Sequence, residues 1–159
     1  MTGKTNIEED LFIADILSRN KIIAMVGASK NWKRPSNFVM KYLQKNGYKV
    51  IPVNPSTAGQ EILGELCYSS LEEIPIKIDM VNIFRPSEFC PSIAKAAIKV
   101  GVKTIWMQLG IINEEVVKLG EKANIKVIFD KCPKMEHTKL SGALGLAGFN
   151  SNLISSKRT

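Results

Sequence analysis

The strongest constraint on the fold of this chain is a regular alternation of short apolar runs with amphipathic stretches. Residues 21–26 are almost entirely apolar and predict a buried strand that ends at Gly27. Residues 35–45 then carry apolar side chains at helical spacing. This alternation is typical of βα units, which build parallel sheets. The sequence therefore predicts an α/β fold with one open, doubly wound parallel sheet and right-handed crossovers.

The predicted elements follow from the same pattern. Strands are expected at residues 21–26, 48–53, 79–84, 103–107 and 126–129. Helices are expected at about residues 8–20, 35–45, 70–74, 87–100 and 113–122. Residues 54–64 are rich in Pro, Ser, Thr and Gly and predict a long loop, whereas residues 70–73 fit a capping box. Asn113 is the expected cap of the last helix, and the helical patterns place Leu11 and Phe89 toward the core.

The chain length of 159 residues corresponds to about one domain. We expect a domain over residues 1–140, followed by a tail over residues 141–159. The glycines of residues 142–148 disfavour a helix in this tail, and its polar end is expected to be disordered. No apolar run approaches the roughly 20 residues of a membrane span, and the first ten residues do not resemble a signal peptide. These features predict a cytoplasmic protein outside the membrane.

The positive charge of the chain is concentrated in one early segment. The net charge is +7, and residues 16–60 contain eight basic and no acidic side chains. The rest of the chain holds 14 basic and 15 acidic residues and is nearly neutral. Such a segment favours a polyanion, which leaves nucleic acid, an anionic membrane surface or a phosphate-rich small molecule. A solvated basic face is the alternative interpretation.

The loop after the first predicted strand combines small and basic residues. Small residues let the backbone approach a phosphate, and the N-terminus of the following helix favours an anion. The chain has neither Gly-x-Gly-x-x-Gly nor the P-loop motif, so neither a dinucleotide nor an NTPase fingerprint is present. An ordinary strand-to-helix turn is the alternative interpretation. The candidate phosphate-binding residues are Gly27, Ala28, Ser29, Lys30, Lys33, Arg34, Pro35 and Ser36.

The second predicted strand ends in Val53, Asn54 and Pro55. An NAD-binding protein places a carboxylate here to bind the ribose hydroxyls. Asparagine can hydrogen-bond a sugar without repelling a ribose phosphate, to which the nearby cations would bind. This end of the strand therefore disfavours NAD and favours NADP or coenzyme A. A simple turn at Asn54 is the alternative.

The third and fourth strands contribute further candidates at the same edge of the sheet. Phe84, Arg85 and Pro86 follow the third strand, where the Phe84 ring either contacts an adenine or belongs to the core. Gln108 and Gly110 follow the fourth strand, and an amide there can bond to a ligand. We expect all five residues near a ligand at the carboxyl ends of the strands.

Cysteine and histidine chemistry is limited in this sequence. The three cysteines lack a Cys-x-x-Cys spacing, and there is one histidine, which predicts free thiols and no His/Cys zinc site. Cys132 follows the fifth strand beside Lys131 and Lys134, which favour a thiolate, but no partner His or acid is identifiable. His137 is expected to be a surface or loop residue. No Ser/His/Asp, paired-carboxylate or metal arrangement can be assembled.

Taken together, several motifs resemble those of a known family. They are Gly27-Ala28-Ser29 with Arg34-Pro35-Ser36, Tyr48 to Pro55, Phe84-Arg85-Pro86, Trp106 to Gly110, and Cys132-Pro133. In this order they are similar to the small stand-alone CoA-binding proteins, which resemble the nucleotide-binding domain of the succinyl-CoA synthetase alpha subunit. The resemblance extends from about Leu11 to Leu140. It implies a Rossmann-like fold that binds CoA across the strand ends, with Cys132 also near the ligand.

Within this resemblance, the phosphates of CoA are expected at residues 27–36 and its adenine near residues 53–55 and 84–86. The synthetase that this family resembles uses a further domain with a phosphorylated histidine, so we expect CoA or acyl-CoA binding without ligase activity. Two alternatives stay open, a small NADP-dependent oxidoreductase and a nucleic-acid or protein-binding module that uses residues 16–60. Nucleic acid is the less favoured partner, because no known RNA- or DNA-binding signature is present. A homo-oligomer is compatible with the sequence.

Overall fold

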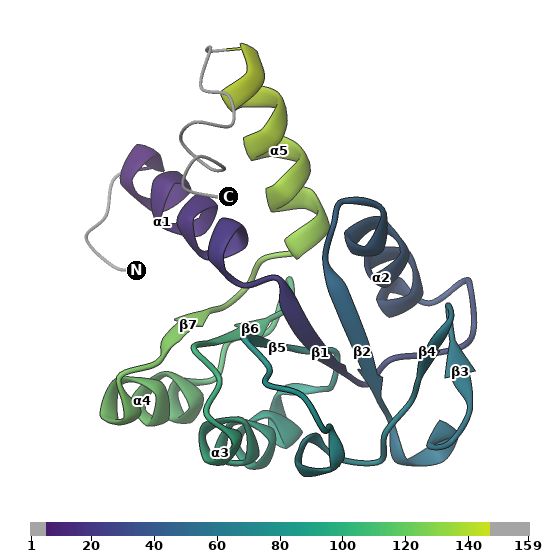
Figure 1. Cartoon of the computed structure of the whole chain (residues 1–159). Helices are drawn as coiled ribbons and strands as arrows, with labels where there is room; N and C mark the ends of the chain where they lie inside the picture. Colours follow the sequence, from purple (N-terminus) through teal and green to yellow (C-terminus); the bar gives the residue numbers. More distant parts are fainter. Residues whose placement is uncertain (1–5, 147–159) are drawn as a thin grey trace.

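A computed structural model describes residues 6–146 and contains a five-stranded parallel sheet (Figure 1). The order of its strands is β2-β1-β5-β6-β7. Their bounds are β1 (Ile22–Val26), β2 (Lys49–Val53), β5 (Met80–Ile83), β6 (Thr104–Met107) and β7 (Lys126–Ile128). Each strand lies within or one residue from its predicted range, and the α/β fold class predicted from the sequence is confirmed.

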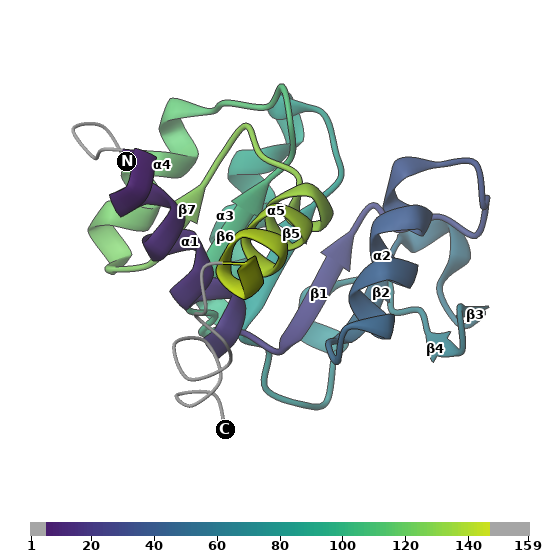
Figure 2. The ribbon, with the colours of Figure 1, turned by 90° about the horizontal axis from the view of Figure 1, so that it is seen from above.

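Helices cover both faces of the sheet (Figures 1 and 2). In the described part of the chain, α1 (Asn6–Arg19), α2 (Pro35–Lys45) and α5 (Pro133–Leu146) pack on one face. On the opposite face lie α3 (Cys90–Val100) and α4 (Glu114–Ala123). Because both faces are covered, the strands are apolar on both sides, which explains their continuous apolar runs.

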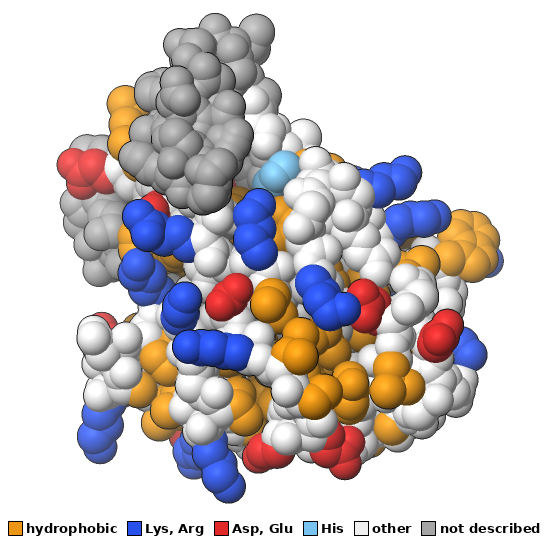
Figure 3. Space-filling view, in the orientation of Figure 1, with side chains coloured by type: hydrophobic (Ala, Val, Ile, Leu, Met, Phe, Trp, Pro, Cys, Tyr) orange, Lys and Arg blue, Asp and Glu red, His pale blue; other side chains and the backbone are white. Residues whose placement is uncertain are grey.

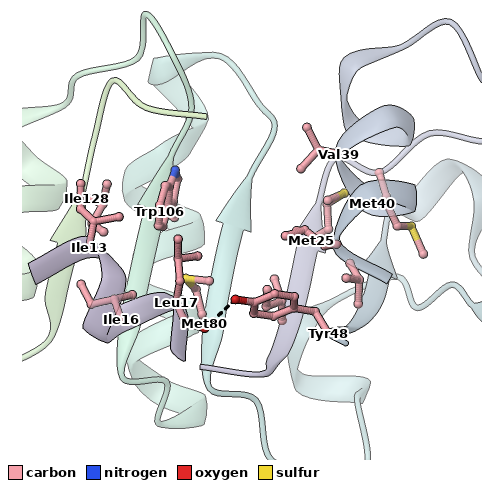
Figure 4. Packing of buried hydrophobic residues seen from close by; sticks show 14 of the residues in the cluster. Ile13, Ile16, Leu17, Met25, Val39, Met40, Tyr48, Met80, Trp106 and Ile128 are labelled. Atoms are coloured by element: carbon pink, nitrogen blue, oxygen red, sulfur yellow. Dashed lines mark hydrogen bonds between the residues drawn. The ribbon is translucent and has the colours of Figure 1, made fainter. Parts of the chain in front are cut away.

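The core beneath α1, α2 and α5 is built around Trp106 and Met25 (Figure 4). Both side chains are fully buried, and the Trp106 indole Nε1 donates a 2.8 Å hydrogen bond to the Lys131 carbonyl. The Tyr48 hydroxyl donates a 2.6 Å bond to the Leu17 carbonyl and ties α1 to β2. Full burial of one large apolar side chain contributes about 1.5–3 kcal/mol. This packing holds the strands together beneath the loops at the edge of the sheet.

The strand order creates a switch point between β1 and β5. From β1 the chain continues into α2 on one face, and from β5 it continues into α3 on the other face. The two loops therefore diverge at the carboxyl ends of adjacent strands, which pair in parallel from Ile23–Met80 to Val26–Ile83. Such a divergence opens a crevice where ligands bind in open α/β sheets.

The structure corrects several sequence predictions. The predicted loop over residues 54–64 contains the 3₁₀ helix η1 (Pro55–Thr57) and strand β3 (Glu61–Ile62), which pairs with β4 (Glu65–Leu66). Helix α5 extends through residues 141–146, where glycines disfavoured a helix. The predicted disorder at the end of the tail lies outside the described residues.

Two side chains predicted to point toward the core are exposed. Leu11 is 46% exposed because Ile13, Ala14 and Ile16 form the buried face of α1 instead. Phe89 is 40% exposed because it precedes α3, in the 3₁₀ helix η3 (Ser87–Phe89). Within residues 6–146, no helix combines the length and apolarity that a membrane span requires.

Candidate functional site

Two adjoining cavities lie at the carboxyl edge of the sheet, at the switch point. The apolar cavity has a volume of about 290 Å³ and lies between the ends of β1 and β2 and the start of α3. The cationic cavity has a volume of about 520 Å³ and lies at the N-terminus of α2. Gly27, Asn54 and Arg85 line both cavities, so the two form one continuous crevice.

Most of the residues predicted from the sequence line this crevice. They are Gly27, Ser29, Arg34, Pro35, Ser36, Val53, Asn54, Pro55, Phe84, Arg85 and Pro86. The predicted residues that line neither cavity are Ala28, Lys30, Lys33, Gln108, Gly110 and Cys132. The residues after β1, β2 and β5 are therefore brought together, whereas those after β6 and β7 lie apart from the cavities.

Gly27 holds three strand ends close together. Its amide donates a 2.9 Å hydrogen bond to the Val53 carbonyl, and its φ is 91°. A Cβ atom at this position would lie 2.3 Å from the Phe84 carbonyl oxygen. Only glycine combines this conformation with such a close approach. The crevice therefore exists in its present form because residue 27 has no side chain.

Asn54 joins the loops that follow β1 and β2. Its Nδ2 donates a 2.9 Å hydrogen bond to the carbonyl of Ala28, which is fully buried. Its Oδ1 accepts bonds from the Ser56 amide at 3.0 Å and the Ser56 hydroxyl at 2.8 Å. The side-chain amide thus has protein partners on both polar atoms. Of the two roles that the sequence allowed, a ligand contact and a simple turn, these bonds match the turn, because Asn54 is the N-cap of η1.

The N-terminus of α2 faces the cationic cavity. Arg34 is the extended N-cap residue and makes no side-chain cap hydrogen bond, and Pro35 occupies the first turn. Asn37 Nδ2 donates a 2.9 Å bond to the Ser29 carbonyl, which fixes the loop on the helix. Pro35 has no amide hydrogen and the Asn37 amide donates to the Arg34 carbonyl at 3.0 Å, so the Ser36 amide and the positive end of the helix dipole are what favour an anion here.

Two arginines supply the positive charge of the crevice. Arg34 is exposed and lines the cationic cavity, whereas Arg85 is half-buried and lines both cavities. The Arg85 guanidinium lies over the Phe89 ring, 4.3 Å from its centroid. Among the described residues neither arginine forms an ion pair with a carboxylate. Both guanidinium groups can therefore bind an anionic ligand.

The two lysines of the same loop are directed to other groups. Lys30 Nζ donates a 2.7 Å hydrogen bond to Gln60 Oε1, beside the β3–β4 hairpin. Lys33 Nζ lies 5.5 Å from the centroid of the Trp32 ring, which is 70% exposed. The three cations of this loop look equivalent in the sequence, but only Arg34 lines the crevice.

The rim after β6 and β7 forms a separate hydrogen-bonded corner. The Gly110 amide donates a 2.7 Å bond to Asp130 Oδ1, and the Gln108 Nε2 atom is buried without a partner among the described residues. Cys132 is half-buried against the core beneath α5. This corner contributes no lining residue to the crevice.

The lysines that flank Cys132 in the sequence interact elsewhere. Lys131 Nζ lies 3.7 Å from Glu9 Oε1, and Lys134 Nζ lies 5.7 Å from the centroid of the Tyr42 ring. The thiolate predicted for Cys132 depended on these two charges. The structure therefore removes its main support.

One wall of the apolar cavity consists of residues that the sequence did not indicate as candidates. The residues of this wall are Ser69, Ser70, Leu71, Glu72, Phe89, Ser92, Ile93 and Ala96. Ser70 makes no cap hydrogen bond to the 3₁₀ helix η2 (Leu71–Glu73), and Glu73 Oε1 instead accepts from the Ser69 amide and hydroxyl at 3.1 and 2.7 Å. The predicted capping box between Ser70 and Glu73 is therefore wrong, because Glu73 bonds to Ser69 instead. The turn-rich segment between β2 and β5 was the sequence feature that could have indicated this wall.

His137 has well-defined partners, contrary to its predicted place on the surface or in a loop. Its Nδ1 lies 2.6 Å from the Tyr42 hydroxyl, which also accepts a 3.0 Å bond from Thr138 Oγ1. Burial lowers the pKa of the imidazole, and the charge of Lys21 lowers it further. This cluster fastens α5 to α2, away from the crevice. Among the described residues, no three His, Cys, Asp or Glu side chains form a metal-binding group.

Known proteins are similar to this chain in sequence and in fold. The uncharacterized protein YneT of Bacillus subtilis (strain 168) is 42% identical over 125 residues, which cover 79% of this chain and 91% of that protein. The ADP-forming acetate-CoA ligase I of Archaeoglobus fulgidus is 28% identical over 131 residues, 76% of this chain. The matched region is 19% of that ligase, so the chain corresponds to about a fifth of its length.

A solved structure of a hypothetical protein from Pyrococcus horikoshii OT3 has a TM-score of 0.80 and 40% sequence identity. The similarity covers 87% of this chain and 93% of that one. These findings confirm the family resemblance drawn from the ordered motifs. The model of the family described as CoA binding domain matches residues 21–138, and the chain belongs to this family.

Proposed function

We propose that this protein binds coenzyme A or an acyl-CoA in the crevice, with the ligand phosphates in the cationic cavity and the base in the apolar cavity. One observation carries the proposal: a helix N-terminus and two arginines that form no ion pair within residues 6–146 adjoin an apolar cavity across shared residues. A nucleotide likewise joins anionic phosphates to a largely apolar base. Membership of the CoA binding domain family supports CoA over other nucleotides.

The charges of the crevice fit a ligand with several phosphates. Arg34 and Arg85 lie in the loops after β1 and β5 and line the same cationic cavity. A guanidinium binds phosphate through a planar pair of donors, so each arginine can hold a different phosphate group. We expect no reaction at this site, because the described residues that line the crevice include serines and one carboxylate but no His, Cys or metal-binding group. The protein would act as a cytoplasmic binding module.

A polyanion-binding surface of larger extent is less consistent with the structure. On the face shown in Figure 3, Lys and Arg side chains alternate with Asp and Glu side chains. A nucleic acid favours a continuous basic stripe. Of the basic residues at positions 16–60, Arg34 is the one that lines the crevice.

Titration calorimetry with CoA, NADPH and ATP tests the proposal. We expect CoA to bind more tightly than either of the other two ligands. Tighter binding of NADPH would favour the oxidoreductase alternative, and no heat with any ligand would refute a nucleotide site.

The arginines can be tested separately from the lysines. A hydrogen bond to a charged group contributes about 1.5–3 kcal/mol, so Arg34→Ala or Arg85→Ala should weaken CoA binding by roughly tenfold or more. The effect of Arg34→Ala should shrink at high salt, because Arg34 is exposed. Lys33→Ala is the matched control, since it removes the same charge from the same loop outside the cavities. Equal losses from Arg34→Ala and Lys33→Ala would refute the assigned geometry.

A further inference from the structure

We propose that Glu72, assisted by Ser70, recognises the exocyclic amino group of the ligand base and thereby selects adenine. This inference rests on the proposed function, because it requires a nucleotide base in the apolar cavity. It adds a residue that determines specificity in a segment that sequence analysis did not assign to the site.

Glu72 has an unusual charge for its position. Among the described residues that line the two cavities, it is the one carboxylate. An ionised carboxylate only accepts hydrogen bonds, and it repels a phosphate. A polyanionic ligand can therefore contact Glu72 only through a part that donates hydrogen bonds. Glu72 lines the apolar cavity and not the cationic one, which places it at the base end of the crevice.

The neighbouring polar groups already have protein partners, whereas Glu72 and Ser70 have none assigned. Glu73 accepts two hydrogen bonds from Ser69, and Ser92 Oγ donates to the Phe89 carbonyl at 3.2 Å. Within the described chain, no hydrogen bond or ion pair engages the Glu72 carboxylate or the Ser70 hydroxyl. These two groups are free to bind a ligand.

The rest of the cavity suits a flat ring. Leu71 is 4% exposed and Val53 is 3% exposed, and they line the cavity with Ile93 and Ala96. A volume of about 290 Å³ lies at the lower end of the range for ligand pockets and accommodates a bicyclic base. Apolar walls contact the faces of the ring and do not distinguish one base from another. Recognition of the base then depends on the polar groups at the cavity edge.

The chemistry of the base edge follows from this arrangement. The 6-amino group of adenine donates a hydrogen bond that the Glu72 carboxylate accepts. Hypoxanthine carries an oxygen at the same position, and two acceptors would then face each other. Glu72 is exposed, so the bound base itself must cover the carboxylate, and an acceptor covered in this way disfavours an analogue that lacks the donor. Glu72→Gln relieves the conflict, because the glutamine amide can accept from an amino group or donate to an oxygen.

The test compares adenosine 3′,5′-bisphosphate with inosine 3′,5′-bisphosphate by calorimetry, beside CoA itself. We expect the unaltered protein to bind the adenosine compound at least tenfold more tightly. In Glu72→Gln this ratio should fall by about tenfold or more, mainly through tighter binding of the inosine compound. Glu61→Gln is the matched control, since Glu61 is exposed on β3 outside both cavities and its replacement removes the same charge.

The outcomes separate this inference from the proposed function. CoA binding with an adenosine-to-inosine ratio that Glu72→Gln leaves unchanged would refute the role of Glu72 and preserve the proposed function. Tighter binding of guanosine 3′,5′-bisphosphate than of the adenosine compound would overturn the selection of adenine. Absence of binding by CoA and by all three bisphosphates would refute both proposals together.

Discussion

Replacement of Gly27 by alanine tests the geometry on which the crevice depends. The added Cβ would lie 2.3 Å from the Phe84 carbonyl oxygen and 2.9 Å from the Phe84 carbonyl carbon. Both atoms belong to the backbone at the end of β5, so no side-chain rotation can relieve the contact. The loops after β1 and β5 would have to separate, and the φ of 91° would strain an alanine even without the contact.

The two costs can be separated in magnitude. Holding a residue with a side chain in a left-handed conformation costs about 1–2 kcal/mol, and the backbone contact adds a further cost of about 1–2 kcal/mol. The total loss in the free energy of unfolding is then about 3 kcal/mol, which lowers the melting temperature by roughly 6–12 °C for a chain of this size.

Gly101→Ala is the matched control for Gly27→Ala. Gly101 has a φ of 87° at the end of α3, and a Cβ there would meet no atom within 4 Å. Calorimetric melting should show a loss for Gly101→Ala that reflects the left-handed conformation alone, and a clearly larger loss for Gly27→Ala. CoA binding should weaken in Gly27→Ala and not in Gly101→Ala. Equal changes in melting temperature would contradict the assigned close approach.

Two further predictions concern buried polar groups. Burial lowers the folded-state pKa of His137, so the unfolded chain binds the proton more readily. The free energy of unfolding should therefore fall as the pH decreases below about 6.5. Urea unfolding from pH 8 to 5 should show a smaller change in this free energy for His137→Asn than for the unaltered protein. Asn82 is fully buried on β5, and neither polar atom has a partner among the described residues. Asn82→Val should therefore raise the melting temperature. Thr104→Val should lower it, because the Thr104 hydroxyl donates a 3.4 Å hydrogen bond to Asn20 Oδ1. A lower melting temperature in both variants would show that the Asn82 amide has hydrogen-bond partners in the folded protein.

The fold was predictable because local signals and tertiary packing agree. Strand β1 is apolar on both sides and is buried on both sides, and Gly27 ends it where the backbone must turn. Asn113 caps α4 as predicted, with its Oδ1 accepting a 3.1 Å bond from the Val116 amide. Helix α5 was missed because its glycines lower intrinsic helix propensity, whereas contacts of this helix with α1 and α2 stabilise it.

The site was predictable only in part, for a geometric reason. Parallel strands that are adjacent in the sheet have their carboxyl ends at the same edge. The residues after β1, β2 and β5 therefore lie close together. The segment of Ser70 and Glu72 belongs to no strand end of the main sheet. Its place depends on the bridge between Val53 and Tyr68 and on the packing of η2 against α3. No local pattern in the sequence specifies those long-range contacts.

The charges of the first loop illustrate the same limit at the level of single side chains. Lys30, Lys33 and Arg34 are separated by at most four positions, and composition assigns them one common role. The turn that places Arg34 at the N-cap of α2 also directs Lys30 toward Gln60 and Lys33 toward Trp32. In the proposed function, Arg34 at the helix terminus and Arg85 in the same cavity would hold the phosphates. Net charge attracts a polyanion to the protein, whereas the backbone of this loop determines which cation meets it.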